Sequence, residues 1–167
     1  MAPTKYVSFI SLLPSNESCY LNLYSHHVHV SQQSNSIAVK REVVIRALCE
    51  YLNEDIGILV KHFSDTQKEE MKEQQERSTM GIFVSRKAGE WDLPADVSLV
   101  VEGVEILSNI SDVATACALL FGVIYAMNLS YPKEHKYLFE VLQKIIMELD
   151  TIKYSPKVQG LRNKLFL

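Results

Sequence analysis

The chain has 167 residues and a formal net charge of −3, and 47% of its residues are hydrophobic while 22% are charged. This length is sufficient for one domain that buries its own core, so neither a metal nor a disulfide is needed to stabilise it. The few glycines and prolines exclude a collagen-like or wholly disordered chain, and the slightly acidic balance argues against a nucleic-acid-binding module.

Residues 1–36 are rich in serine and histidine and contain only two charged side chains, Lys5 and Glu17. Stretches at 6–13 and 20–30 hold many β-forming residues, but neither alternates as a half-buried strand does. We therefore expect an irregular N-terminal arm, which could be poorly ordered.

This arm carries a histidine cluster, His26, His27 and His29. In an extended strand, His27 and His29 would project from the same face, which suits two metal ligands. A zinc site needs three or four ligands, however, and histidines in a serine-rich arm are more commonly polar surface. The three residues are the candidates for a metal site, but we expect neither a functional metal nor a cofactor.

A helical pattern begins near Ile37 and continues to Leu52, with the apolar residues on one wide face. Asn53 is a suitable N-cap for a second helix, which would extend to about Phe63. The segment 64–78 consists almost wholly of charged and amide side chains, which is typical of a solvated helix or a polar linker. The alternative for this segment is a docking surface for a partner.

Strand signals follow at 80–85, MGIFVS, and at 97–101, VSLVV. They predict an antiparallel hairpin with a long connection, which must lie on helices because an isolated hairpin is marginal in water. Gly103 is expected to end the second strand, and residues 104–108 are expected to form a helical turn.

Residues 113–129 form the longest uncharged run, VATACALLFGVIYAMNL. Ser111 is expected to cap this helix. A run of 17 residues is at the lower limit of what spans a bilayer. Because a helix that is apolar on all sides also suits the centre of a soluble core, we interpret the run as a core helix.

Residues 133–149 predict an amphipathic helix with an unusually wide apolar stripe. The stripe comprises Leu138, Phe139, Val141, Leu142, Ile145, Ile146 and Leu149. A seam between two helices is narrower than this, so the helix should contact at least two elements. The second contact comes either from a helix of the same chain or from another chain, and in the latter case Phe139, Leu142 and Ile146 are the candidate interaction residues.

Ser155 and Pro156 predict the start of a terminal helix that continues through Leu167. Together the elements predict a helix-dominated α+β fold with about five helices and one β-hairpin, whose strands lie near 80–85 and 97–101. Residues 37–167 would form a single domain behind the arm at 1–36.

The three cysteines, Cys19, Cys49 and Cys117, are odd in number and far apart, which is typical of reduced thiols in the cytoplasm or nucleus. The sequence contains no nucleophile elbow, P-loop or dinucleotide-binding motif. We therefore expect no enzymatic activity and name no catalytic residue.

Most of the chain after residue 37 resembles a known group of proteins. The matching stretches are KREVVIRALCEYLNED at 40–55, MGIFVSR at 80–86, PADVSLVVEGVEIL at 94–107 and LLFGVIYAMNLSYPKEHKYLFEVLQKIIMELD at 119–150. In these stretches the chain resembles the C-terminal domain of uncharacterised, multicopy vertebrate proteins, expanded in fishes, that are often labelled as sterile-alpha-motif domain-containing. The resemblance implies no activity, ligand or catalytic residue.

We expect a non-enzymatic protein-interaction or self-association module, whose partner is another protein or a second copy, without membrane association. The alternative is a nucleic-acid-associated protein of mobile-element ancestry, which the multicopy character of the resembling group suggests. Nucleic acid is the less expected partner because the chain carries a net negative charge.

Overall fold

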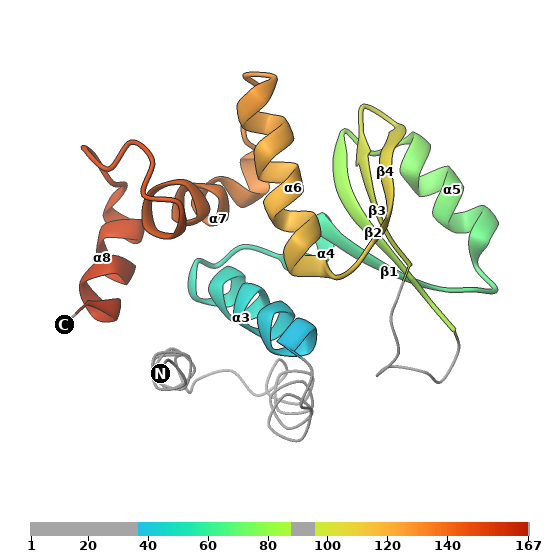
Figure 1. Ribbon diagram of the computed structural model, residues 1–167, viewed down its shortest axis with the longest axis horizontal. Helices are drawn as coiled ribbons and strands as arrows, with labels where there is room; N and C mark the ends of the chain where they lie inside the picture. Colours follow the sequence, from blue (N-terminus) through green and yellow to red (C-terminus); the bar gives the residue numbers. More distant parts are fainter. Residues whose placement is uncertain (1–36, 88–95, 167) are drawn as a thin grey trace.

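The computed structural model describes residues 37–87 and 96–166 of the chain. Its centre is a four-stranded sheet, which lies between α5 on the right and α6 on the left in Figure 1. The strands, in spatial as well as sequence order, are β1 (Val60–Ser64), β2 (Met80–Arg86), β3 (Asp96–Val101) and β4 (Val104–Ile110). β1 and β2 are parallel, whereas the β2–β3 and β3–β4 pairs are antiparallel.

The prediction of about five helices and a single β-hairpin is therefore wrong. The strands near 80–85 and 97–101 pair with each other, but they do so inside a mixed sheet with two further strands. The described residues also contain six α-helices. Both additional strands occupy segments for which the local pattern favours helix.

The first additional strand is β1. The helix before it, α4 (Ile56–Leu59), lasts a single turn, and its N-cap is Asp55, whose carboxylate accepts a hydrogen bond from the Gly57 N–H at 2.9 Å. From Val60 onward the chain is extended, and Val60 and Phe63 pack on opposite faces of the sheet. The helix α5 (Lys68–Glu76) forms the crossover that a parallel pair of strands requires.

The second additional strand, β4, replaces the helical turn predicted at 104–108. Glu102 and Gly103 have positive φ angles of 52° and 75°, the geometry of a two-residue hairpin turn. Val101 and Val104 pair across this turn, so the chain reverses directly into β4. A Cβ atom on Gly103 would lie 2.7 Å from the carbonyl oxygen of Glu76, and the position therefore requires glycine.

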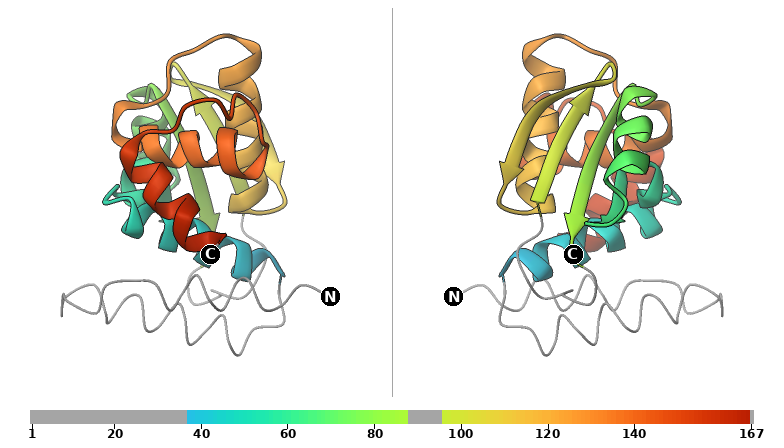
Figure 2. Two further views of the ribbon diagram at one scale, coloured as in Figure 1. Left: turned by 90° about the vertical axis from the view of Figure 1, so that its left-hand side faces the viewer. Right: turned by 90° about the vertical axis from the view of Figure 1, so that its right-hand side faces the viewer.

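Helices cover both faces of the sheet (Figure 2). On one face, Phe63, Phe83 and Val100 form a small core with Met71 of α5. The main core lies on the other face, where α6 (Val113–Ala126) packs against β2 and β3 and where α3 (Ile37–Tyr51) packs against α6.

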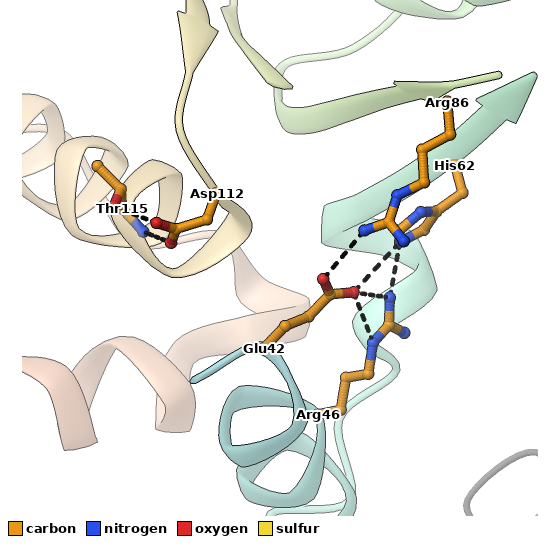
Figure 3. Close-up of polar contacts among 6 residues, drawn as sticks. All are labelled: Glu42, Arg46, His62, Arg86, Asp112 and Thr115. Carbon is orange, nitrogen blue, oxygen red and sulfur yellow. Dashed lines mark hydrogen bonds and ion pairs between the residues drawn. The ribbon is translucent and has the colours of Figure 1, made fainter. Parts of the chain in front are cut away.

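Leu120 of α6 is fully buried in this main core. The N-cap of α6 is Asp112 and not Ser111, because the Asp112 carboxylate accepts a hydrogen bond from the Thr115 N–H at 2.8 Å (Figure 3). Within the described ranges, no helix combines the length and the apolar character needed to cross a membrane.

The apolar stripe predicted one continuous α-helix at 133–149, but the structure does not contain one. It consists of a 3₁₀ turn (Lys133–His135), α7 (Lys136–Val141) and a π-helical turn (Leu142–Ile146). The last helix, α8 (Pro156–Leu165), has Ser155 as its N-cap.

The loop between α3 and α4 attaches the C-terminal helices to the rest of the molecule. The Glu54 carboxylate accepts hydrogen bonds from the N–H groups of Tyr137 and Leu138, at 2.8 and 2.9 Å, and so caps α7. Lys157 of α8 donates to the carbonyl oxygen of Leu52 at 2.6 Å. Helices far away in sequence are thereby held against one short loop.

Candidate functional site

The three candidate interaction residues do not share one surface. Phe139 is fully buried, and its ring stacks on that of Tyr131 with centroids 5.4 Å apart. Leu142 is half-buried, whereas 56% of Ile146 is exposed. The π-helical turn explains the split, because its extra residue per turn displaces the following side chains from an α-helical stripe. Phe139 is thus a core residue, and of the three Ile146 is the most accessible to a partner.

The candidate metal ligands His26, His27 and His29 lie outside the described residues, as does Cys19. Within 37–87 and 96–166, no three His, Cys, Asp or Glu side chains are placed to hold a metal ion together. Cys49 and Cys117 are free and buried, and burial raises the pKa of both thiols, that of Cys117 to about 12. Such thiols are protonated at neutral pH and are poor nucleophiles.

A charged cluster joins α3 to His62 in the middle of β1 and to Arg86 at the end of β2 (Figure 3). Glu42 Oε1 accepts hydrogen bonds from Arg46 at 2.7 and 3.1 Å, and Glu42 Oε2 lies 3.3 Å from Arg86 Nη2. Arg46 Nη2 also lies 2.6 Å from His62 Nε2. Burial favours the protonated form of Glu42, but the charges of Arg46 and Arg86 outweigh it and lower the pKa of this carboxyl.

Glu42 is consequently an anion at neutral pH, bound to two arginines that do not exchange protons in this range. A carboxylate held in this way is unsuited to general acid or base catalysis, which needs a pKa near the working pH. The cluster therefore has a structural role, since its hydrogen bonds and ion pairs connect α3 to the sheet.

A groove of about 530 Å³ follows β1 between α3 and α5. Its lining mixes the cations Arg46 and Lys61 with the anions Glu50, Asp55 and Glu70. Because the charges alternate in sign, the groove does not favour a ligand of one charge.

The backbone of β1 is engaged at both ends of the strand. At its start, the Val60 N–H donates to the carbonyl oxygen of Ile56 in α4. At its end, the Ser64 N–H donates to Gln67 Oε1 at 3.0 Å, and the Ser64 carbonyl oxygen accepts from the Gln67 N–H at 2.9 Å. With both ends of this five-residue strand engaged, only its middle residues could pair with a further strand. β1 is therefore a protected edge of the sheet.

The opposite edge, β4, is exposed and irregular, because its pairing with β3 has two register shifts and Asn109 has a positive φ of 55°. Among the described residues β4 pairs with β3 alone, and residues 104–109 are exposed. Three of its exposed side chains are large and apolar: Val104 is 61%, Ile106 40% and Leu107 41% exposed. The one charged residue of the strand, Glu105, accepts a hydrogen bond from Gln75 of α5 at 3.3 Å and so lies on the α5 face of the sheet.

The helix α6 lies beside β4 along the same edge of the molecule, as both views of Figure 2 show. It contains no charged residue, and its outer face exposes Ala118, Leu119, Gly122 and Tyr125. A strand with one charged residue, Glu105, and an uncharged helix face therefore adjoin. We name this region the edge surface and define it by its large exposed apolar residues, Val104, Ile106, Leu107, Leu119 and Tyr125.

The sequence pattern did not reveal the edge surface, because it assigned residues 104–108 to a helical turn. The sequence feature that indicates a hairpin here is the pair Glu102-Gly103, which lies between two runs of β-forming residues, VSLVV and VEIL. Asn-Gly or Asp-Gly is the usual mark of a two-residue hairpin, and Glu-Gly is a weaker one. The exposure of Leu119 and Tyr125 was also hidden, since an apolar helix looks the same in sequence whether all its sides are covered or not.

No protein-family model, curated protein or solved structure matches this chain. The resemblance to the C-terminal domain of the multicopy vertebrate proteins therefore stays a prediction. What the chain does has to be inferred from the chemistry of its own surface.

Proposed function

We propose that this chain is a non-enzymatic protein-interaction module that binds its partner through the edge surface. The observation that carries the proposal is the meeting of an exposed sheet edge, whose one charged residue is Glu105, with an uncharged helix face. Soluble proteins seldom leave contiguous apolar surface exposed unless it binds something, and the centres of protein interfaces are poor in charged residues.

The chemistry elsewhere supports a binding role over a catalytic one. The charged cluster at Glu42 is locked by two arginines, and the described thiols of Cys49 and Cys117 are buried with raised pKa values. The nucleic-acid alternative has no specific support, because the paired arginines of that cluster are partly neutralised by Glu42. Binding through phosphate contacts would weaken steeply with salt, which an electrophoretic titration at two salt concentrations would reveal.

The proposal can be tested with a photo-reactive amino acid in place of Tyr125, which is 60% exposed on α6. Benzoylphenylalanine keeps the aromatic character of the site and forms a covalent adduct with whatever protein touches it. Expressed at a natural level in the cells from which the sequence derives, the labelled chain should give discrete adducts on irradiation. Mass spectrometry then identifies the attached protein, including a second copy of the chain.

The matched control places the same amino acid at Ile58, which is 49% exposed on α4, beside the protected edge. Adducts at Tyr125 in clear excess over Ile58 support the proposal. Equal adduct levels at both positions, or none at either, would contradict binding through the edge surface.

A further inference from the structure

We infer that residues 142–150 switch between two helical registers, which we call the π form and the α form. The π form is the observed one, in which the π-helical turn (Leu142–Ile146) ends the helix. In the α form, α7 continues with α-helical hydrogen bonds as far as Leu149, without a π-helical turn. The switch lies in the C-terminal helices, away from the edge surface, and does not depend on the proposed function.

The helix ends in the π form at a point where the sequence has no stop signal, since residues 142–154 contain no glycine, asparagine or proline. Glu148 has a left-handed φ of 54°, at a helix end where glycine usually stands, and Asp150 follows with a φ of 51°. This conformation is strained for glutamate, which is a good helix former, as are Met147 and Leu149. The local preferences of these residues therefore oppose the π form.

The π form also exposes apolar side chains that the α form would align with the core. Ile146 is 56% and Leu149 37% exposed. In a continuous α-helix, Leu149 would lie within about 40° of the line through Leu138, Leu142 and Ile145, and Ile146 would lie about 40° from Leu142. Leu138 is fully buried, so this side of the helix faces the core. The α form would thus withdraw from solvent a pair of apolar residues that the π form displays.

Contacts with the following loop compensate for these costs. The Tyr154 hydroxyl donates to the carbonyl oxygen of Lys144 at 3.4 Å, and Lys144 Nζ donates to the carbonyl oxygen of Lys153. The N–H groups of Met147 and Leu149 are hydrogen-bonded in the π form, at 2.9 and 2.8 Å, and each would bond four residues back in the α form. Backbone hydrogen bonds therefore do not decide between the forms. Strain and apolar exposure on one side oppose side-chain contacts on the other, which is the condition for two populated conformations.

The two forms differ in what they present to other molecules. The apolar pair Ile146 and Leu149 is available on the surface in the π form and is withdrawn in the α form. A molecule that contacts both side chains would therefore bind the π form and shift the population towards it. π-helical turns are frequent at functional sites, which agrees with such a role.

The test compares two substitutions of Glu148, which is exposed and can be changed without loss of core packing. Glycine adopts a left-handed φ without strain and weakens a helix, so Glu148→Gly should favour the π form. Alanine is strained in the left-handed conformation and is the best helix former, so Glu148→Ala should favour the α form. The ratio of the two forms should differ by about tenfold or more between the variants.

The readout is the NMR chemical shifts of the amide and Cα groups of residues 142–147 in the isotope-labelled full chain. We expect the wild-type shifts to lie between those of the two variants, or two sets of signals whose intensities follow the same order. The control is Glu73→Gly, which changes a largely exposed residue of α5 and should leave these shifts unchanged.

Shifts at 142–147 that are the same in Glu148→Gly and Glu148→Ala would overturn the switch, because the two variants would then share one register. Changes that Glu73→Gly reproduces would overturn it as well, since they would not arise from the helical register.

Discussion

At the scale of single residues, turns and caps determine where the elements of this chain begin and end. Gly103 makes the hairpin between β3 and β4 possible, and Asp55 and Asp112 begin α4 and α6. Both aspartates accept a backbone N–H through the side chain, which is the usual role of an N-cap. In both places the sequence offered a second capping residue close by, and the residue nearer to the helix is the one that caps it.

Gly103→Ala should lower the free energy of unfolding. Alanine at φ 75° is strained, which alone costs about 1–3 kcal/mol, and its Cβ atom would also press on the Glu76 carbonyl oxygen. Gly160→Ala is the matched control, since its Cβ atom meets nothing within 4 Å in the middle of α8, and it should stabilise by up to about 1 kcal/mol. Urea unfolding compares the two, and equal effects would show that the turn does not depend on glycine.

Glu42 should make the domain sensitive to acid. Its folded pKa is lowered from the ordinary value of 4.5, so its contribution to stability is present above pH 4.5 and is lost as the pH falls through the folded pKa. The wild-type protein should therefore lose its stability advantage over Glu42→Gln on acidification. Urea unfolding at several pH values measures this difference.

The control for that experiment is Glu73→Gln, which removes a largely exposed carboxylate of α5. A gap between wild type and Glu42→Gln that stays constant with pH would show that Glu42 does not supply the acid sensitivity. If the stability difference between wild type and Glu73→Gln depends on pH in the same way, the loss of any negative charge has this effect.

At the scale of the elements, α6 is a helix with two different environments on one apolar surface. Leu120 is fully buried against the sheet, whereas its neighbour Leu119 is 40% exposed. The two residues are of the same type and adjacent in sequence. The same substitution at each position therefore compares the contribution of the buried core with that of the exposed edge surface.

Leu120→Ala should cost about 2–5 kcal/mol through lost burial and the cavity that remains. Leu119→Ala should change the free energy of unfolding by less than about 1 kcal/mol, because this side chain lies on the outer face of α6. Chemical denaturation of both variants is the measurement. Similar losses for the two would mean that the outer face of α6 is also packed within one chain.

The pattern of residues predicted most helices of this fold, and it failed where long-range contacts decide between helix and strand. Val60 and Phe63 have the spacing of one helix face, yet pairing with β2 makes them alternate across a sheet. Residues 104–110 become a strand because the turn at Gly103 returns the chain to β3. At Leu142 the loss of α-helical register has no local signal, so Phe139 and Ile146 were expected on one stripe. Pairing partners and π-helical turns depend on contacts that a local pattern does not contain.

At the scale of the whole molecule, one core links the first described helix to the last. Cys49 of α3 and Cys117 of α6 are both buried in it, together with Val158 and Leu161 of α8. The domain is expected to open as a unit if these elements depend on one another.

In a Cys19→Ser background, the native protein should react slowly with a thiol reagent at Cys49 and Cys117, and both should react at the same rate. Each thiol is buried with a raised pKa, so labelling requires an opening of the core. Mass spectrometry of labelled peptides over time gives the two rates. Much faster labelling of Cys49 would indicate that α3 detaches independently of α6.

The loop after α3 has a consequence for how the chain folds in time. Its partners in α7 and α8 lie 83 residues away from Glu54, at Tyr137, and 105 residues away from Leu52, at Lys157. Contacts that close such long loops form late, and they slow folding relative to a bundle of local contacts. During synthesis, Glu54 and Leu52 therefore lack these partners until Tyr137 and Lys157 have left the ribosome. The nascent chain would be most in need of a chaperone during that interval, when the open edge of β4 already exists and the helices that complete the core do not.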